Sequence, residues 1–220
     1  MVQVKVCGIT NEEDALCAFQ CGAAALGFIF YPPSGRYISP EQARQIINIL
    51  PQSLVKVGVF VNESAAEVKR IVEYCGLDFV QLHGDESPEY CSQFPAAQVI
   101  KAVVLKNEDD LSHALGYDVA AILVDSRHAG LYGGTGKKAN WELAQCIKNK
   151  KLLILSGGLN EANVKKALEK VVPQALDINS GVEKSPGKKD HIKLARLFNI
   201  VRAANFSTDN APLIFTKREI

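Results

Sequence analysis

The sequence predicts a single-domain α/β fold, a (β/α)8 TIM barrel of alternating parallel strands and helices. Short runs of apolar and β-branched residues alternate with longer segments that have helical periodicity. The alternation repeats eight times, whereas an open doubly wound sheet usually has only about five or six strands. No Pro/Gly/Ser-rich linker or low-complexity tract divides the chain. One barrel therefore explains the pattern better than two smaller domains.

The predicted strands span residues 3–7, 24–30, 54–60, 78–82, 97–104, 119–125, 151–155 and 175–178. Helical segments fall near residues 11–21, 40–50, 64–75, 86–94, 108–115, 140–148, 160–170 and 188–203. Thr10 with Glu13 predicts a capping box at the first helix, and Ser39 before Pro40 predicts the start of the second. We assign residues 1–205 to the barrel and residues 206–220 to a C-terminal tail, whose role the sequence does not indicate.

The overall charge argues against a polyanionic partner. The chain has 25 Lys and Arg against 24 Asp and Glu, a formal net charge of +1. Neither a nucleic acid nor a membrane surface is therefore an expected partner, and the ligand should be a small molecule. The N-terminus lacks the features of a signal peptide, and no apolar run approaches the roughly 20 residues that span a bilayer. We expect a cytoplasmic protein.

The cysteine pattern indicates free thiols. The six cysteines include no C-x-x-C pair, which argues against both a disulfide framework and a zinc ribbon. Cys17 and Cys21 lie four residues apart on a predicted helix, but no nearby histidine or second pair completes a metal site. We expect these two to pack in the helix interface, and we expect no metal.

Two strand ends carry groups suited to proton transfer. Cys7 ends the first strand and Asp125 the sixth, and the C-terminal strand ends form the working face of such barrels. A free thiol is only about 3% ionised at pH 7, but a following helix N-terminus favours the thiolate while Glu12 and Glu13 oppose it, which predicts partial activation. An acidic role for Asp125 needs a pKa raised by burial or by a nearby anion. Alternatively, Cys7 is a small core residue and Asp125 a loop cap.

Glycine-rich turns follow the last three strands. Gly133 and Gly134 lie in the longest loop, after the sixth strand, where a lid is expected. Backbone N–H groups at glycine turns bind phosphate, and the loops after strands 7 and 8 are the recurrent phosphate site of this fold. The phosphate-binding candidates there are Gly157, Gly158, Asn179, Ser180 and Gly181. Each glycine alone is equally explained by a tight turn, but together they favour a phosphorylated ligand.

Three further polar residues lie near strand ends. Arg36, after the second strand, has the planar fork that binds a carboxylate, although a surface arginine is an equal alternative. His83 follows the fourth strand, and it either contacts the ligand or packs within its loop. Asp177 lies inside the last strand, where an unpaired charge would be costly, so it should enter a polar site or a hydrogen-bond network.

Eight short motifs together carry a family resemblance. They are KVCGIT (5–10), GFIF (27–30), SGR (34–36), VGVF (57–60), QLHG (81–84), Asp125 with GGTG (133–136), GGL (157–159) and DINSGVE (177–183). In these motifs and their order, the sequence resembles the phosphoribosylanthranilate isomerases of tryptophan biosynthesis from residue 1 to about 203. Ser156 and Asn179 stand where the family often has alanine and serine, which affects no catalytic assignment.

The resemblance implies an Amadori rearrangement of N-(5-phospho-β-D-ribosyl)anthranilate to 1-(2-carboxyphenylamino)-1-deoxy-D-ribulose 5-phosphate, without cofactor or metal. By the same resemblance, Asp125 is the general acid at the furanose ring oxygen and Cys7 is the base that removes the C2′ proton. Arg36 binds the anthranilate carboxylate, and the turns after strands 7 and 8 bind phosphate. His83, Gly133, Gly134 and Asp177 are the other candidate substrate contacts.

Other functions remain open at this stage. The related histidine-pathway isomerases resemble enzymes in which both the acid and the base are aspartates. Cys7 in the position of the base argues against membership of that family. Indoleglycerol-phosphate synthases use catalytic lysine and glutamate, for which Lys5 and Lys101 within strands are insufficient evidence. A non-catalytic phosphosugar-binding barrel is the alternative from another class. The protein is expected to be a monomer or weak homodimer.

Overall fold

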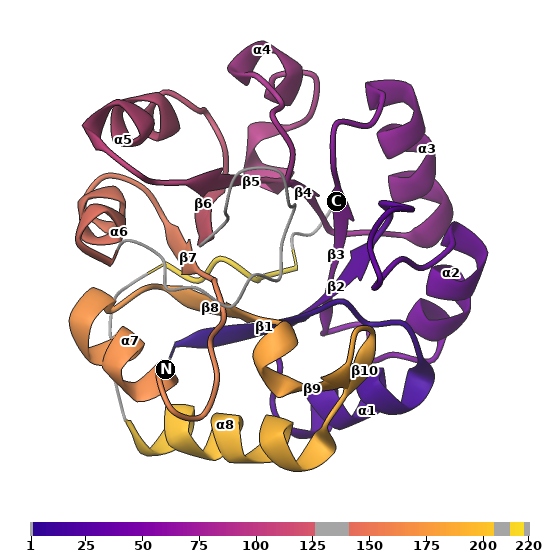
Figure 1. Cartoon of the computed structure of the whole chain (residues 1–220). Coiled ribbons are helices and arrows are strands. Elements are labelled where there is room, and N and C mark those ends of the chain that lie inside the picture. Colours follow the sequence, from indigo (N-terminus) through magenta and orange to yellow (C-terminus); the bar gives the residue numbers. More distant parts are fainter. Residues whose placement is uncertain (1, 126–140, 205–211, 218–220) are drawn as a thin grey trace.

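The strands close into a barrel in chain order. The computed structural model describes residues 2–125, 141–204 and 212–217. Within these, β1 to β8 pair successively in parallel, and β8 pairs back with β1. Figure 1 views the barrel near its axis and shows the helices around the outside. The predicted TIM-barrel fold is confirmed.

The strands and helices lie close to their predicted positions. The barrel strands are β1 (Gln3–Cys7), β2 (Ala25–Ile29), β3 (Val55–Phe60), β4 (Phe79–Leu82), β5 (Val99–Val104), β6 (Ala121–Asp125), β7 (Leu153–Leu155) and β8 (Ala175–Ile178). The helices are α1 (Glu12–Gln20), α2 (Pro40–Asn48), α3 (Ala65–Cys75), α4 (Pro88–Cys91), α5 (Glu108–Leu115), α6 (Trp141–Lys148), α7 (Val164–Val171) and α8 (His191–Ala203). Two short 3-10 helices, η1 (Ala96–Gln98) and η2 (Ser180–Val182), and the hairpin strands β9 (Glu183–Ser185) and β10 (Lys188–Lys189) complete the elements.

The pleat of each strand separates two hydrophobic layers. Val4 and Val6 of β1 belong to the layer between strands and helices. Residues such as Val57 and Phe79 instead form a second cluster inside the barrel. Because side chains alternate along a strand, the odd-numbered residues of β1 face the interior. Position along β1 therefore decides which residues reach the cavity at the C-terminal end of the strands.

The two predicted helix starts have different outcomes. Ser39 caps α2 in a capping box with Gln42, and Pro40 is the first helical residue, as predicted. The Thr10 capping box is wrong, because Asn11 caps α1 by accepting a hydrogen bond from the backbone N–H of Asp14 at 2.8 Å. Thr10 instead donates to the carbonyl of Gly187. The hydroxyl therefore ties the loop after β1 to the β9–β10 hairpin.

The chain after β8 is more structured than the sequence indicates. Helix α8 begins at His191 rather than near residue 188, because the Asp190 side chain accepts from the backbone N–H groups of Ile192 and Lys193 at 3.0 and 3.1 Å. The preceding residues form η2 and the β9–β10 hairpin. This hairpin brings charged side chains to the C-terminal end of the barrel.

A C-terminal segment, residues 212–217, packs on the other end of the barrel. Ile214 and Phe215 are buried in the same cluster as the barrel interior, and the Phe215 ring meets Phe79 edge to face. Gln3 fixes the backbone, since its side chain donates to the Phe215 carbonyl at 2.8 Å and accepts from the N–H groups of Ile214 and Phe215 at 2.8 and 2.9 Å. The yellow segment crosses the middle of the barrel in Figure 1.

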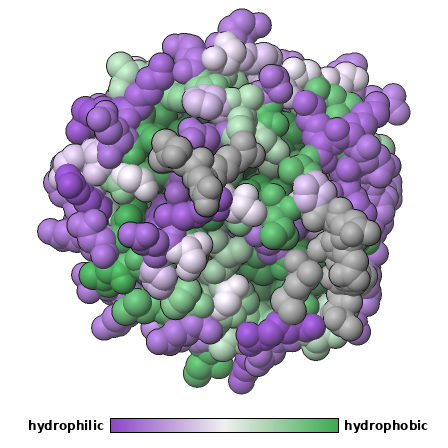
Figure 2. All heavy atoms as spheres, turned by 180° about the vertical axis from the view of Figure 1, so that it is seen from behind, coloured by the Kyte–Doolittle hydropathy of each residue, from purple (hydrophilic) through white to green (hydrophobic). Residues whose placement is uncertain are grey.

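Figure 2 shows the molecule from this opposite side, where hydrophilic residues predominate around the outline and hydrophobic residues gather nearer the centre. Ile214 and Phe215 of the segment pack against the interior cluster at this end of the barrel. No helix in the described ranges is long and apolar enough to cross a membrane.

Truncating Phe215 should destabilise the barrel. We expect Phe215→Ala to lower the free energy of unfolding by about 3 kcal/mol, because a buried aromatic ring is lost and a cavity remains. Urea denaturation measures the change. Leu213→Ala is the control, since Leu213 is 55% exposed and its loss should cost less than about 0.5 kcal/mol. Equal effects of the two substitutions would show that the segment does not contribute through burial.

Candidate active site

Most of the predicted site residues line one cavity at the C-terminal ends of the strands. Its empty space is about 660 Å³ when the part that is open to solvent is counted. The predicted residues among its walls are Cys7, Arg36, His83, Asp125, Gly157, Gly158, Asp177, Asn179 and Ser180. Gly181 is not in the wall, and Gly133 and Gly134 lie outside the described residues. Residues distant in sequence therefore meet at the predicted end of the barrel.

Cys7 lies against an apolar wall. Its side chain is buried beside Ile29 and Val59, with Tyr31 packed against them. Burial raises the pKa of the Cys7 thiol, and although Lys5 lowers it, the net shift is upward. The prediction of partial activation by the helix N-terminus is therefore wrong in direction.

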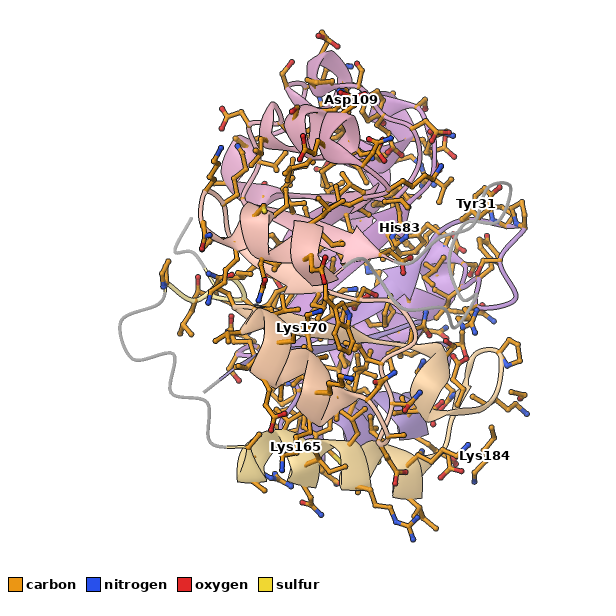
Figure 3. All side chains as sticks on the ribbon, turned by 60° about the vertical axis from the view of Figure 1, so that its left-hand side comes forward. Tyr31, His83, Asp109, Lys165, Lys170 and Lys184 are labelled. Atoms are coloured by element: carbon orange, nitrogen blue, oxygen red, sulfur yellow. The ribbon has the colours of Figure 1, made fainter. Side chains whose placement is uncertain are left out.

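Asp125 ends β6 and is buried in the same cavity. The Nε2 atom of His83 lies 3.3 Å from an Asp125 oxygen, and the other ring nitrogen lies 2.7 Å from the Gln81 amide. These two contacts fix the orientation of the imidazole. In Figure 3, His83 lies toward the same side of the barrel as Tyr31. His83 thus contacts the carboxyl group predicted to be the acid.

A buried ion pair lies beneath Cys7. Lys5 and Asp177 are register partners on β1 and β8, and Lys5 Nζ is 2.7 Å from Asp177 Oδ1. Ser156 Oγ donates to the second Asp177 oxygen at 3.3 Å. Burial lowers the pKa of Lys5, but the charges of Asp177 and Cys7 outweigh burial and raise it overall. The expectation that Asp177 enters a hydrogen-bond network is confirmed.

Lys5 is a buried residue next to the cavity that the sequence analysis did not assign to the site. The signal was present, because Lys5 precedes Cys7 by two positions and residues two apart share one face of a strand. A fully buried lysine on that face has to be paired. What the sequence does not reveal is the partner, which is 172 positions away.

Arg36 reaches the cavity from the loop after β2 and is held by Glu183. Its Nε lies 3.0 Å from both carboxylate oxygens, and its Nη2 lies 2.7 Å from one of them. Lys189 Nζ donates to the same carboxylate at 2.9 Å. Burial raises the pKa of Glu183, but Arg36 and Lys189 outweigh burial and lower it overall. Glu183 and Lys189 were not predicted as site residues because the hairpin that places them was not predicted.

The predicted phosphate turns lie side by side, because β7 and β8 are neighbours. Gly157 and Gly158 have φ values of +97° and +63°, a region that side chains disfavour. A Cβ on Gly181 would lie 1.9 Å from the carbonyl oxygen of Leu159. Gly181 therefore permits the close approach of the two loops rather than lining the cavity. Backbone groups of both loops remain at the cavity rim.

The remaining cysteines do not join this cavity. Cys17 and Cys21 are partly buried and pack against the core between strands and helices, as expected. Burial raises the pKa of Cys17 to about 11. In the described ranges, no three His, Cys, Asp or Glu residues are grouped closely enough to hold a metal ion.

Removing the Glu183 charge should destabilise the protein in a pH-dependent way. We expect Glu183→Gln to cost about 3 kcal/mol at pH 7, because Arg36 and Lys189 lose a buried anion. Since the folded pKa of Glu183 is lowered, its contribution is present above the ordinary glutamate value of about 4.3 and is lost as the pH falls through the folded pKa. Urea denaturation should therefore show the two proteins converging in acid.

The control for this experiment is Glu67→Gln. Glu67 pairs with Arg70 at 2.7 Å on an exposed helix face, and such pairs contribute at most about 1 kcal/mol. A Glu183→Gln effect no larger than that of the control would contradict the role of the buried charge.

Comparisons with known proteins agree with this site. The family model of N-(5'-phosphoribosyl)anthranilate (PRA) isomerase matches residues 4–200. The N-(5'-phosphoribosyl)anthranilate isomerase of Syntrophus aciditrophicus (strain SB) is 52% identical over 202 residues, which cover 92% of this chain and 88% of the relative.

Solved structures give the same result. A phosphoribosyl anthranilate isomerase in complex with reduced 1-(o-carboxyphenylamino)-1-deoxyribulose 5-phosphate is 44% identical and has a TM-score of 0.83, with 92% of this chain and 100% of that chain covered. Monomers of the dimeric enzyme from Thermotoga maritima are 43% identical with a TM-score of 0.81 and the same coverage. The chain therefore belongs to the N-(5'-phosphoribosyl)anthranilate isomerase family.

Proposed function

We propose that this enzyme isomerises N-(5-phospho-β-D-ribosyl)anthranilate to 1-(2-carboxyphenylamino)-1-deoxy-D-ribulose 5-phosphate, a step of L-tryptophan biosynthesis. The observation that carries the proposal is that Cys7 and Asp125 line one cavity with the turns after β7 and β8, in a chain of this family. A related structure holds a reduced form of the same product. An acid, a base and an anion-binding rim are the groups that the reaction requires.

The first step is acid catalysis by Asp125. The carboxylic acid donates its proton to the furanose ring oxygen, and the bond between that oxygen and C1′ breaks. The lone pair of the anthranilate nitrogen forms a double bond to C1′, which gives a protonated Schiff base. Burial of Asp125 and the nearby substrate anions favour the protonated carboxyl group that this step needs.

The second step is base catalysis by Cys7. The thiolate removes the proton from C2′, and the electron pair of that bond becomes the C1′–C2′ double bond of an enolamine while the π electrons of the C1′=N bond return to nitrogen as a lone pair. Proton transfer to C1′ and loss of the hydroxyl proton then give the ketone at C2′. C1′ is reduced and C2′ is oxidised within one molecule, so the electrons balance without a redox cofactor.

The rest of the cavity supports binding of the two anionic ends. Arg36 is proposed to bind the anthranilate carboxylate with the guanidinium edge that Glu183 leaves open. Backbone N–H groups of residues 157–158 and 179–180, which line the cavity, are proposed to bind the phosphate. The apolar wall of Ile29 and Val59 suits the aromatic ring.

His83 is proposed to orient Asp125 and contact substrate, and Gly133 and Gly134 are proposed contacts from the loop after β6. We further propose a cytoplasmic monomer or weak homodimer with a small phosphorylated substrate and no nucleic-acid or membrane partner. The Thermotoga maritima relative is described as dimeric, so sedimentation velocity over a concentration series distinguishes the two states.

Removing either proton-transfer group should abolish most activity. We expect Cys7→Ala and Asp125→Ala each to lower kcat by about two to four orders of magnitude while the fold remains, because proton transfer in the transition state is lost. The fluorescence decrease on consumption of phosphoribosylanthranilate measures turnover, beside a parallel assay with the histidine-pathway substrate. Cys146→Ala, which changes an exposed thiol, is the control. Near wild-type turnover in either variant would refute the assignment of that residue.

Removing Arg36 should act mainly on binding. We expect Arg36→Ala to raise KM about ten- to a hundredfold with a smaller change in kcat, because a charged hydrogen-bond donor to the carboxylate is lost. Steady-state kinetics measure both constants. Arg70→Ala is the matched control, since Arg70 is exposed and pairs with Glu67 on α3. An unchanged KM in Arg36→Ala would mean that the carboxylate is bound elsewhere.

A further inference from the structure

Cys7 has an environment that opposes its proposed role as base. Its side chain is buried, and burial disfavours the thiolate. The charged groups that act on it come from three strands: Lys5 on β1, Asp177 on β8 and Lys189 on β10. Asp177 opposes ionisation, while the two lysines favour it. A base in this position therefore depends on a nearby cation.

Of the two lysines, Lys5 is the one whose amine lies beside the Cys7 sulfur. A Cβ on Gly27 would lie 2.8 Å from the Cys7 sulfur and 3.0 Å from Lys5 Nζ, so both atoms occupy the space left by this glycine on β2. The charge of Lys5 lowers the pKa of the Cys7 thiol, against the effect of burial. Lys189, by contrast, donates to Glu183 and Asn179, and burial lowers its pKa.

We propose that Lys5 is a positioning residue whose buried ammonium charge stabilises the Cys7 thiolate, and that Asp177 keeps this ammonium group protonated. The inference rests on the proposed function and adds two residues to it. Lys5 is fully buried, with its amine bound to Asp177 at 2.7 Å, and it is not among the residues of the cavity wall. It acts through Cys7 rather than on the substrate.

The arrangement also explains why a costly buried pair is retained at this place. A lysine alone in the barrel would lose its proton or destabilise the fold. Asp177 prevents this, and its second oxygen is occupied by Ser156. When Cys7 ionises, the same ammonium group faces two anions, and its position between them lowers the electrostatic cost of the second.

The test compares two variants with the wild type. The double variant Lys5→Met/Asp177→Asn removes both charges together and leaves no unpaired ion. Asp177→Asn removes only the anion that is proposed to keep Lys5 protonated. Alkylation of Cys7 by iodoacetamide is followed across pH by mass spectrometry of the Cys7 peptide, which reports the thiolate of this one cysteine directly. Urea denaturation checks that both variants fold.

The double variant should alkylate Cys7 severalfold more slowly than the wild type at pH 7, because Lys5 acts on the thiol more strongly than Asp177 does and its loss moves the thiol titration upward. The basic limb of its kcat profile should move in the same direction, with KM changing less. An alkylation profile of the double variant equal to that of the wild type would overturn the proposal.

Asp177→Asn alone gives a second test if the double variant does not fold. Because Asp177 is proposed to keep Lys5 charged, its loss should make Cys7 alkylate more slowly than in the wild type, and an unchanged or faster rate would overturn the proposal. Failure of the proposed function is separate, since it would appear as full turnover in Cys7→Ala whatever the alkylation profiles show.

Discussion

The ion pair between Lys5 and Asp177 lies where the barrel closes. The two residues are register partners across the β1–β8 seam, so the first and last strands meet around a buried charge pair. Such a pair contributes little net stability, but leaving either charge alone would cost about 3–5 kcal/mol. Lys5 and Asp177 therefore depend on each other. Of the two charges in this pair, the ammonium group of Lys5 lies near the Cys7 sulfur.

Strand β1 connects the two ends of the molecule through three inward positions. Gln3 binds the backbone of the C-terminal segment, Lys5 pairs with Asp177 in the middle, and Cys7 reaches the cavity. The two-residue spacing follows from the pleat. The family model matches residues 4–200, so Gln3 and residues 214–215 both lie outside the matched range.

Periodicity and strand-end position were sufficient to predict the barrel and the placement of Cys7 and Asp125 in one cavity, because these features depend on local pattern and on a general property of the fold. The partners of Lys5 and Arg36 were not predictable in this way. Each pairing joins residues about 150 positions or more apart and needs the closed register or the β9–β10 hairpin. The prediction that Thr10 caps the first helix was wrong for a similar reason, since its hydroxyl donates to the distant Gly187 carbonyl instead of accepting from the adjacent helix.

The charges around the cavity also bear on how an anionic substrate and a thiolate can coexist. A bound phosphate and carboxylate would each disfavour ionisation of Cys7, in addition to the burial that already raises its pKa. Those same anions favour the protonated form of Asp125, which the first step requires. One bound ligand therefore assists the acid and hinders the base. A cation that is buried, paired and adjacent to Cys7 but outside the cavity wall resolves this conflict, because it favours the thiolate without contacting the substrate anions.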